Sequence, residues 1–340
     1  MSKMNFLAKT MVLAALVFAS FGLSAQGRIE LTPAKSTTPT EMSLSGFRMT
    51  LNYNAIESQS ISTEKGNFSA ISIDDTYVTG HDGQAQLPST HKLVASPVGS
   101  TPVVIVHGYS ESEYQLDENG IGRLYSRQPS VRKETKPEDV HFIYDEKYYT
   151  SEGYDRNELV TCEIMGCIRG MQIVSVQINP VKYNPATNSI KVFNDIDLEV
   201  KFENGDVEAM KENIVKTYSP YFDVIYKQLF NGKAIMSVYD EHPDLYKTPV
   251  KMLVVANDKY RDVMTPWLEW KTKKGFYITE GYTSQIGTSS DQIKTWIRSQ
   301  YSAGVASGVA PTFLVIFGDK TDVPESAVGS YTEKVTDLYY

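Results

Sequence analysis

A single change of pattern divides this sequence into two parts. From Phe47 to about Glu203 the chain carries β-branched and aromatic runs, several of which alternate apolar with polar residues. Gly, Pro, Asn and Asp separate the runs, and no convincing helical pattern lies between them. About seven strands in succession predict an antiparallel β-sandwich or jelly roll. The runs are FRMTLNYNAI, FSAISID, HKLVASPV, TPVVIVHGYSESEY, VHFIYDEKYY, IVSVQINPVKYN and IKVFNDIDLEVKFE.

The second part, from Lys251, alternates strands with helices. KMLVVAND is a continuous apolar run typical of a buried parallel strand. A helical segment at 262–274, the strand FYITEGYT, a helix capped near Ser289 and the strand PTFLVIFGD follow. Such β-α-β-α-β units build parallel sheets, so we expect an α/β domain. The roughly 90 residues from Lys251 to Tyr340 are fewer than the ~150 of an ordinary domain. We therefore expect the domain to be incomplete.

The region between the two parts has a character of its own. Residues 203–233 show partial helical spacing that Pro220 interrupts, which predicts a helical connector. The segment from Gly232 onward, through AIMSVYDEHPDLYKTPV, reads as an irregular linker. We place the domain boundary at Lys233. This divides the mature chain into a β-rich region at 26–233 and an α/β region at 234–340.

The first 25 residues are typical of an export signal. Lys3 and Lys9 precede an apolar run at 11–23, which is too short for a membrane span of ~20 residues. The sequence then becomes polar, and we expect cleavage between Ala25 and Gln26. No other stretch could span a membrane as a helix. The mature chain is therefore expected to be secreted, extracellular or at the cell surface after export through the inner membrane.

The composition excludes several function classes. A formal net charge of −8 gives no overall attraction for nucleic acid. The sequence has no glycine-rich phosphate loop after the strand at 251–258, no HExxH and no CxxC. Its histidines are scattered, and no complete set of nucleophile, base and orienting group is visible. The residues alone identify no catalytic site.

Cys162 and Cys167 are the only cysteines. They lie five residues apart in a predicted strand, which would place them on opposite faces, ~16 Å apart. A disulfide would require a tight turn at Gly166, because bridged Cα atoms lie within ~7 Å. We favour two unpaired thiols packed as small apolar residues.

An acidic group follows the last strand of the α/β part. Asp319, Asp322 and Glu325 come at its carboxyl end, where parallel sheets gather ligand-binding groups. Oxygen ligands at this spacing could bind calcium. A solvated loop with helix-capping aspartates also explains the spacing, and on spacing alone it is the preferred interpretation.

Several segments resemble one known family, the gingipains, which are secreted cysteine endopeptidases. KMLVVANDKYRDVMTPWLEWKTKKGFY is similar to the opening of their catalytic domain. SPYFDVIYKQLFNGK, DLYKTPVKMLVVA and KVTDLYY are similar to the lysine-specific member. LPSTHKLVASPVGSTPVVIV, RQPSVRKETKPEDVHFIYD and RGMQIVSVQINPVKYN resemble the family's pro-region. The resemblance is collinear over nearly the whole chain after the signal peptide.

This resemblance implies an activity and a processing event. It implies a caspase-like catalytic unit that cuts proteins after Lys, with Arg as the alternative, using a His and a Cys that lie beyond Tyr340. The 340-residue chain is therefore expected to hydrolyse nothing itself. It also implies that calcium binds in the catalytic domain, near Asp319 and Asp337, and that cleavage near Lys233 releases the pro-region. The implied partners are the chain's own or a related mature protease domain, and protein substrates.

One polar loop interrupts the β-rich region. The segment SRQPSVRKETKPED, at 126–139, is basic and bounded by prolines. A protease that cuts after basic residues needs an acidic specificity pocket, and a rigid basic loop could block it. Our hypothesis is that Arg132 or Lys133, ahead of Arg127, occupies that pocket. A solvated basic loop without this role explains the segment equally well.

Three interpretations therefore remain open at this stage. The first is a precursor fragment of a gingipain-like protease, with a pro-region that aids folding and maintains latency. The second is a short, non-enzymatic product that binds and inhibits a related protease in trans. The third is an unrelated surface adhesion module built on a β-sandwich.

Overall fold

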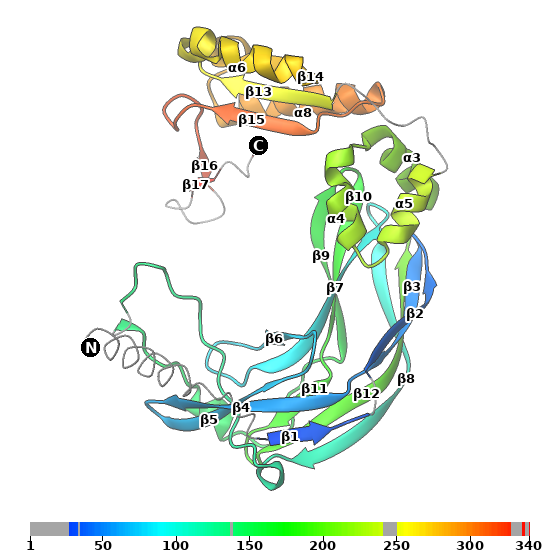
Figure 1. The fold of residues 1–340 in the computed structure, drawn as a ribbon, viewed down its shortest axis with the longest axis vertical. Coiled ribbons are helices and arrows are strands. Elements are labelled where there is room, and N and C mark those ends of the chain that lie inside the picture. The colour runs from blue at the N-terminus through cyan, green and yellow to red at the C-terminus, as the bar shows by residue number, and fades with distance from the viewer. Residues whose placement is uncertain (1–26, 33–34, 137–138, 241–249, 328–334, 337–339) are drawn as a thin grey trace, which may run out of the picture.

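The computed structural model describes residues 27–32, 35–136, 139–240, 250–327, 335–336 and 340. The predicted signal peptide and the bond between Ala25 and Gln26 lie outside these residues. Figure 1 shows a curved β-rich region, a cluster of helices at one end of it, and a small α/β unit beyond the helices. None of the helices in the described part of the chain is long and apolar enough to cross a bilayer.

The β-rich region consists of antiparallel sheets, as the alternating runs predict. One sheet has the order β1-β4-β5 and a second β6-β7-β10-β9; the third has the order β11-β12-β3-β2, with β8 also paired to β12. The strands are β1 (Gly27–Glu30), β2 (Ser36–Met42), β3 (Gly46–Asn52), β4 (Ala55–Thr63), β5 (Gly66–Ser72), β6 (Tyr77–Thr79), β7 (Leu87–Ser96), β8 (Thr101–Gln115), β9 (Val160–Ile168), β10 (Met171–Ile178), β11 (Val181–Asn184) and β12 (Ser189–Glu203). Two short helical elements, η2 (Asp117–Asn119) and α2 (Glu146–Tyr149), interrupt them. The run VHFIYDEKYY, predicted as a strand, forms none and instead contains α2, so that prediction is wrong.

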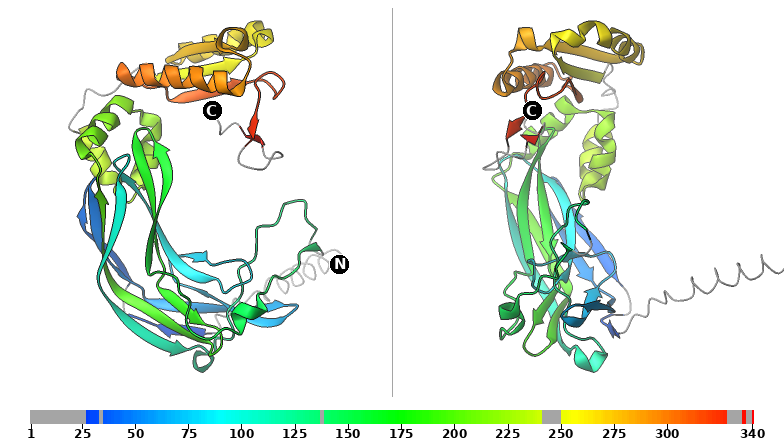
Figure 2. Two further views of the ribbon diagram at one scale, coloured as in Figure 1. Left: turned by 180° about the vertical axis from the view of Figure 1, so that it is seen from behind. Right: turned by 90° about the vertical axis from the view of Figure 1, so that its left-hand side faces the viewer.

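A core between the sheets confirms the predicted sandwich. Met49 on β3 and Leu198 on β12 are fully buried, and they share one apolar cluster with Val174 and Val176 of β10 in the facing sheet. Successive side chains of a strand point to opposite faces, so each sheet buries one alternating set. The long strands β8 and β12 pair along most of their length, and Figure 2 shows them following the outer curve of the region.

The cysteines differ from expectation in their geometry. Cys162 pairs with Val176 and Cys167 with Gln172 across β10, and these partners are four residues apart. A register shift in β9 inserts one extra residue between the cysteines, so they share a face of the strand. The prediction of opposite faces is therefore wrong, because a bulge breaks the alternation. Both thiols are free, as expected. Cys162 packs against the core, but Cys167 is exposed, so the expectation that both pack as small apolar residues is wrong for Cys167.

A cluster of helices covers one end of the sandwich. It consists of α3 (Val207–Thr217), η4 (Pro220–Phe222), α4 (Asp223–Gln228) and α5 (Gly232–Asp240). The side chain of Asp206 caps α3, and the chain breaks before Pro220 as predicted. The irregular linker predicted from Gly232 begins instead with helix α5. Ile235, Val238 and Tyr239 lie on one face of α5 and are buried in a second apolar cluster, which stabilises this short helix.

The last part is a parallel sheet of order β14-β13-β15, as predicted. Its elements are β13 (Val250–Ala256), η6 (Asp258–Tyr260), α6 (Arg261–Lys273), β14 (Phe276–Tyr282), α7 (Thr283–Ile286), α8 (Ser290–Ala306) and β15 (Phe313–Phe317), followed by β16 (Ser326–Ala327) and β17 (Val335–Thr336). Val254 packs with Met264 of α6, whereas Val255 packs with Ile293 of α8. Alternate residues of β13 therefore face the two helices, which explains why its apolar run is continuous.

Candidate inhibitory loop, processing site and peptidase sheet

The basic loop leaves the sandwich at Arg127 through a backbone ladder. The Arg127 N–H donates to the carbonyl oxygen of Gln84 at 2.7 Å, and its own carbonyl accepts from the N–H of Gly83 at 2.8 Å. Its Nε lies 4.0 Å from a carboxylate oxygen of Asp82. Arg127 is half-buried. The backbone of Arg127 is therefore held against the sandwich, which makes it less suited than the later basic residues to enter another protein.

The side chain of Gln128 closes the base of the loop. Its Nε2 donates to the carbonyl oxygen of Ile143 at 2.9 Å, and its Oε1 accepts from the Ile143 N–H at 2.8 Å. The hydroxyl of Ser126 donates to the same carbonyl at 2.7 Å. These bonds join the two ends of the loop where no strand pairing does so. They fix the base of the segment that carries Arg132 and Lys133.

Aromatic side chains support the returning end of the loop. The ring of Phe142 lies 5.6 Å from that of Tyr125 and 5.3 Å from that of Phe68, centroid to centroid. Tyr144 stacks on Tyr149 at 4.4 Å. Aromatic pairs at these separations add packing energy beyond the area that they bury. The returning end of the loop therefore packs on a cluster of aromatic rings.

Arg132 and Lys133 are exposed at a turn beyond this base. The N–H of Thr135 donates to the carbonyl oxygen of Arg132 at 3.0 Å, which closes the turn. Among the residues that the structure describes, no carboxylate forms an ion pair with either side chain. In Figure 1 the loop projects from the β-rich region on the side toward which β15 runs. This exposure is what an inhibitory role requires, and a solvated loop shares it.

Lys233 lies in the first turn of α5 with an exposed side chain. The residue two positions earlier, Asn231, is fully buried and binds both polar groups of Ala95: the Ala95 N–H donates to Oδ1 at 3.0 Å, and Nδ2 donates to the Ala95 carbonyl at 2.8 Å. Nδ2 also lies 3.2 Å from the carbonyl of Ser43. The lysine side chain is accessible, but the backbone around it is helical and tied to the sandwich.

The carboxyl ends of the parallel strands carry a charged network. Asp322 is buried, accepting from Lys259 Nζ at 2.5 Å and from the Tyr260 hydroxyl at 2.7 Å. The bond from Lys259, and then that from Tyr260, lowers the pKa of Asp322. Asp258 accepts from the hydroxyl of Ser284 at 2.7 Å, and this bond lowers the pKa of Asp258. The two carboxylates are held ionised by their neighbours.

Calcium remains a prediction at this edge. Calcium takes about six to eight oxygen ligands. Asp322 is already neutralised by Lys259, and Asp319 accepts from the Lys320 N–H at 2.6 Å. Asp337 lies outside the described residues, among which no group of three or more carboxylate, His or Cys side chains is arranged to hold a metal. Asp319 and Asp322 thus already have hydrogen-bond or ion-pair partners at this edge.

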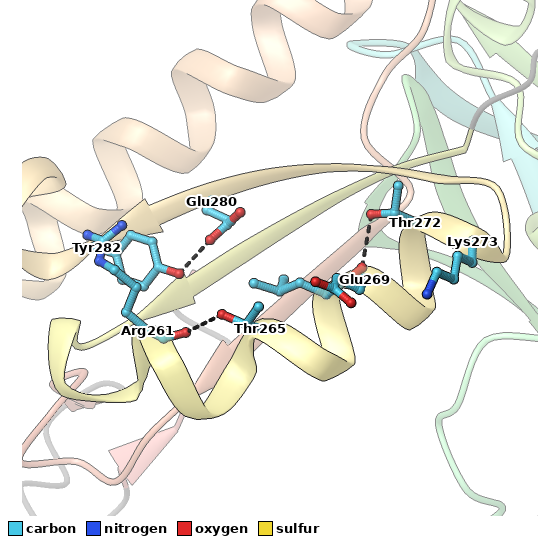
Figure 3. A pocket seen from close by; sticks show the side chains of 8 residues that line it. Arg261, Thr265, Glu269, Thr272, Lys273, Glu280 and Tyr282 are labelled. Atoms are coloured by element: carbon cyan, nitrogen blue, oxygen red, sulfur yellow. Dashed lines mark hydrogen bonds between the residues drawn. The ribbon is translucent and has the colours of Figure 1, made fainter.

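A pocket of about 410 Å³ lies between α6 and β14 (Figure 3). At one end the guanidinium of Arg261 stacks 3.6 Å from the ring of Tyr282, whose hydroxyl donates to Glu280 at 2.5 Å. Burial raises the pKa of Tyr282 to about 12. The lining residues are Arg261, Thr265, Leu268, Glu269, Thr272, Lys273, Glu280 and Tyr282. This set contains no cysteine or histidine, so the pocket does not supply a cysteine protease's chemistry.

Cys162 is not an activated nucleophile. Cys162 packs against the sandwich core, and burial raises the pKa of its thiol to about 11, whereas a nucleophilic cysteine has a lowered pKa. Of the histidines, His107 pairs with Glu199 at 2.9 Å and His91 packs on the ring of Tyr77. These contacts are structural, and that no catalytic residue lies in the β-rich region stays a prediction.

Comparison with known proteins identifies the two parts. Residues 35–228 match the family model Propeptide_C25, and residues 245–340 match the model of peptidase family C25. The chain belongs to peptidase family C25, the family of the gingipains. Lys-gingipain of Porphyromonas gingivalis is 41% identical over 98% of this chain. The chain spans about a fifth (19%) of that relative's length.

Two further comparisons also match gingipains. Gingipain R1 of Porphyromonas gingivalis is 21% identical over 80% of the chain. A solved structure described as giving insight into the zymogenic latency of gingipain K is 37% identical, with a TM-score of 0.50, and covers 52% of this chain and 97% of its own. The resemblance in the sequence is thereby confirmed. The β-rich region is a gingipain propeptide, and the α/β region is the start of a gingipain peptidase domain.

Three features of these sites had no clear signal in the sequence. The bond from Gln128 to Ile143 joins residues fifteen apart in a segment without periodicity. Helix α5 is short, and its apolar face predicts a helix only when the surface on which it packs is known. A third feature, the burial of Arg169 at a hairpin turn, is contrary to the usual exposure of arginine.

Proposed function

We propose that the β-rich region, at 26–233, is the folding aid and latency inhibitor of a secreted cysteine endopeptidase that cuts after Lys, with Arg as the alternative. The observation that carries the proposal is the basic loop, closed at its base by Gln128 and exposed at Arg132 and Lys133. The homology to Lys-gingipain supports the cysteine-peptidase chemistry and the preference for lysine. The loop's partner is the mature peptidase domain of the same or a related protein.

Inhibition follows from charge and rigidity. A peptidase specific for a basic residue binds the substrate cation in an acidic pocket, and Arg132 or Lys133 offers such a cation on an exposed turn. Productive cleavage requires the substrate backbone to adopt the geometry of the transition state. A loop fixed at its base resists that change, so it occupies the pocket and is cut slowly. Inhibition then ends when cleavage near Lys233 releases the pro-region.

The proposal also covers the location of the protein and its binding of calcium. Export through the inner membrane, with cleavage between Ala25 and Gln26, would place the protein outside the cell or at its surface. Calcium would bind in the peptidase domain through residues that include Asp319 or Asp337. N-terminal sequencing of the exported protein tests the first statement, which predicts Gln26 as the first residue. The second statement is tested by comparing how much calcium raises the melting temperature of the parent chain and of the Asp319→Asn variant.

Inhibition assays on a mature lysine-specific gingipain test the central part. We expect the purified chain to inhibit it, and Arg132→Ala or Lys133→Ala to weaken inhibition by at least about tenfold, the scale of one charged contact in a buried pocket. Arg127→Ala should change inhibition little, because that side chain stays beside Asp82. Full inhibition by a chain in which both Arg132 and Lys133 are alanine would refute the role of the loop.

A chain that inhibits without ever being cut near Lys233 would support the alternative of a stand-alone inhibitor acting in trans. The same assay distinguishes the two, because mass spectrometry of the inhibited mixture shows whether the bond after Lys233 has been cleaved.

A further inference from the structure

A buried arginine lies at the tip of the β9–β10 hairpin. Arg169 and Gly170 form its two-residue turn, with φ of 48° and 78°. Turns of this kind favour Asn-Gly, because both residues need positive φ. Arginine at the first position is therefore unexpected, and its side chain is 8% exposed. A side chain on Gly170 would meet Cβ of Asn213 at 2.9 Å, so the tip is packed closely on α3.

The pro-region itself holds the arginine in place. Nε of Arg169 donates to the carbonyl oxygen of Thr217, at the end of α3, at 2.5 Å. The Thr217 hydroxyl donates in turn to the Arg169 carbonyl at 2.9 Å. The guanidinium lies 4.8 Å from the ring centroid of Phe222. These contacts, all made within the pro-region, orient the guanidinium.

The outer face of the guanidinium contacts the peptidase segment. Nη1 of Arg169 donates to the carbonyl oxygen of Pro311 at 3.0 Å. Next along the chain, the hydroxyl of Thr312 lies 2.9 Å from that of Ser219. The ring of Tyr221 packs edge-on against that of Phe313, with centroids 4.9 Å apart. Hydrogen bonds and aromatic packing thus join the two parts at one place.

This contact lies at the amino end of the parallel sheet. Residues 311–313 lead into β15, and the charged network of Asp258 and Asp322 is at the opposite, carboxyl end. In Figure 1 the helices α3 to α5 lie beneath the end of the sheet where β13 begins. The basic loop lies at the opposite end of the curved β-rich region. The contact at Arg169 is therefore separate from the proposed inhibitory loop.

We propose that the tip of the β9–β10 hairpin, with Arg169 at its centre, is a docking site for the amino edge of the peptidase sheet. Its partner is the peptidase segment, which presents the Pro311 carbonyl, the Thr312 hydroxyl and the Phe313 ring. Arg169 is already oriented by Thr217 and Phe222, so docking does not have to order a flexible side chain. The site fixes the pro-region on the sheet, and the basic loop acts from there. Only this last statement rests on the proposed function.

A disulfide between the two parts measures the docking directly. Ser219→Cys and Thr312→Cys are introduced into the full chain with Cys162→Ser and Cys167→Ser. Because the two hydroxyls are 2.9 Å apart, the new thiols should form a disulfide rapidly under mild oxidation. Adding Arg169→Met should slow formation by about tenfold, the scale of one charge-assisted hydrogen bond, and Arg169→Lys should have a smaller effect. Arg156→Met, at an exposed arginine, is the control.

Tyr221→Ala provides an independent test if Arg169→Met fails to fold. The side chain of Tyr221 is 53% exposed, so its loss spares the pro-region core, yet it should also slow the disulfide. The proposal is overturned if no disulfide forms in the parent chain. It is also overturned if Arg169→Met and Tyr221→Ala both form the disulfide as fast as the control. If only one of the two variants folds, the rate of that variant decides. Disulfide formation needs no protease, so a failure here is distinguishable from a failure of inhibition.

Discussion

Gln128 and Ile143 bind each other as neighbouring strands do, although neither lies in a strand. The side-chain amide of Gln128 makes both bonds, donating at 2.9 Å and accepting at 2.8 Å. We expect Gln128→Ala to loosen the loop without unfolding the chain. Losing two hydrogen bonds of about 1 kcal/mol each should raise the fraction of molecules with an open loop by roughly tenfold or more. Limited digestion with trypsin should then cut after Arg132 and Lys133 that much faster.

The control for this prediction is Gln59→Ala, at an exposed glutamine of β4. It should leave the digestion rate of the loop unchanged. If Gln128→Ala is cut no faster than the control, the loop is not held by this side chain, and its rigidity must have another source.

Helix α5 should protect the bond after Lys233. Proteolysis favours exposed, flexible backbone, whereas this backbone is helical and Asn231 ties it to Ala95. Asn231→Ala leaves the polar groups of Ala95 buried and unpaired, at a cost of about 3 kcal/mol. We expect cleavage after Lys233 by a lysine-specific endopeptidase to accelerate by at least tenfold, measured by mass spectrometry.

Ser237→Ala changes an exposed position of the same helix and should have little effect. Cleavage after Lys65, in the turn between β4 and β5, serves as an internal reference. Cleavage after Lys233 as fast as after Lys65 in the unmodified chain would show that the helix gives no protection.

The two thiols should differ in reactivity. Burial raises the pKa of Cys162 to about 11, so only ~0.1% of it is thiolate at pH 8. Exposed Cys167 should therefore react first with a thiol reagent, and Cys162 should react quickly only when the chain unfolds. Peptide mapping after brief labelling at pH 8 measures this. Equal labelling of the two in the folded chain is the contrary result.

Asp322 should make the peptidase segment sensitive to acid. Its pKa is lowered in the folded chain by Lys259 and then Tyr260, so the stabilisation is fully present above the ordinary carboxyl pKa of about 3.9. It is lost as the pH falls through the lower, folded value. The difference in unfolding free energy between the parent chain and Asp322→Asn should be constant from pH 7 to about 5 and shrink below about pH 4.

Urea unfolding at each pH measures that difference, with Asp262→Asn, at an exposed carboxylate of α6, as the control. A difference that does not change across this range would mean that Asp322 is not stabilised in its ionised form by Lys259.

Local patterns predicted the elements whose partners are close in sequence. The apolar run of β13 and the capping box at Ser289 and Gln292 were readable because they depend on period and on neighbouring residues. The bulge in β9 was not, because one inserted residue reverses the faces of everything beyond it. Arg169 and α5 were also not readable. Both owe their structure to surfaces contributed by distant parts of the chain.

The candidate site was predictable only in part for the same reason. The exposed basic residues of the loop are visible in the composition of 126–139. The Gln128 bonds and the aromatic base under Phe142 depend on contacts across the sandwich, with Phe68 more than seventy residues away. Such contacts decide whether a basic loop is flexible or fixed, and composition does not record them.

Whether the basic loop occupies the specificity pocket is tested by steady-state inhibition of a mature lysine-specific gingipain by the intact chain. The inhibition is measured at a series of concentrations of a small lysine substrate. If the basic loop occupies the specificity pocket, the substrate competes with it, and the apparent inhibition constant rises in proportion to one plus the ratio of substrate concentration to KM. An inhibition constant that is independent of substrate concentration, or an absence of inhibition, would contradict the account.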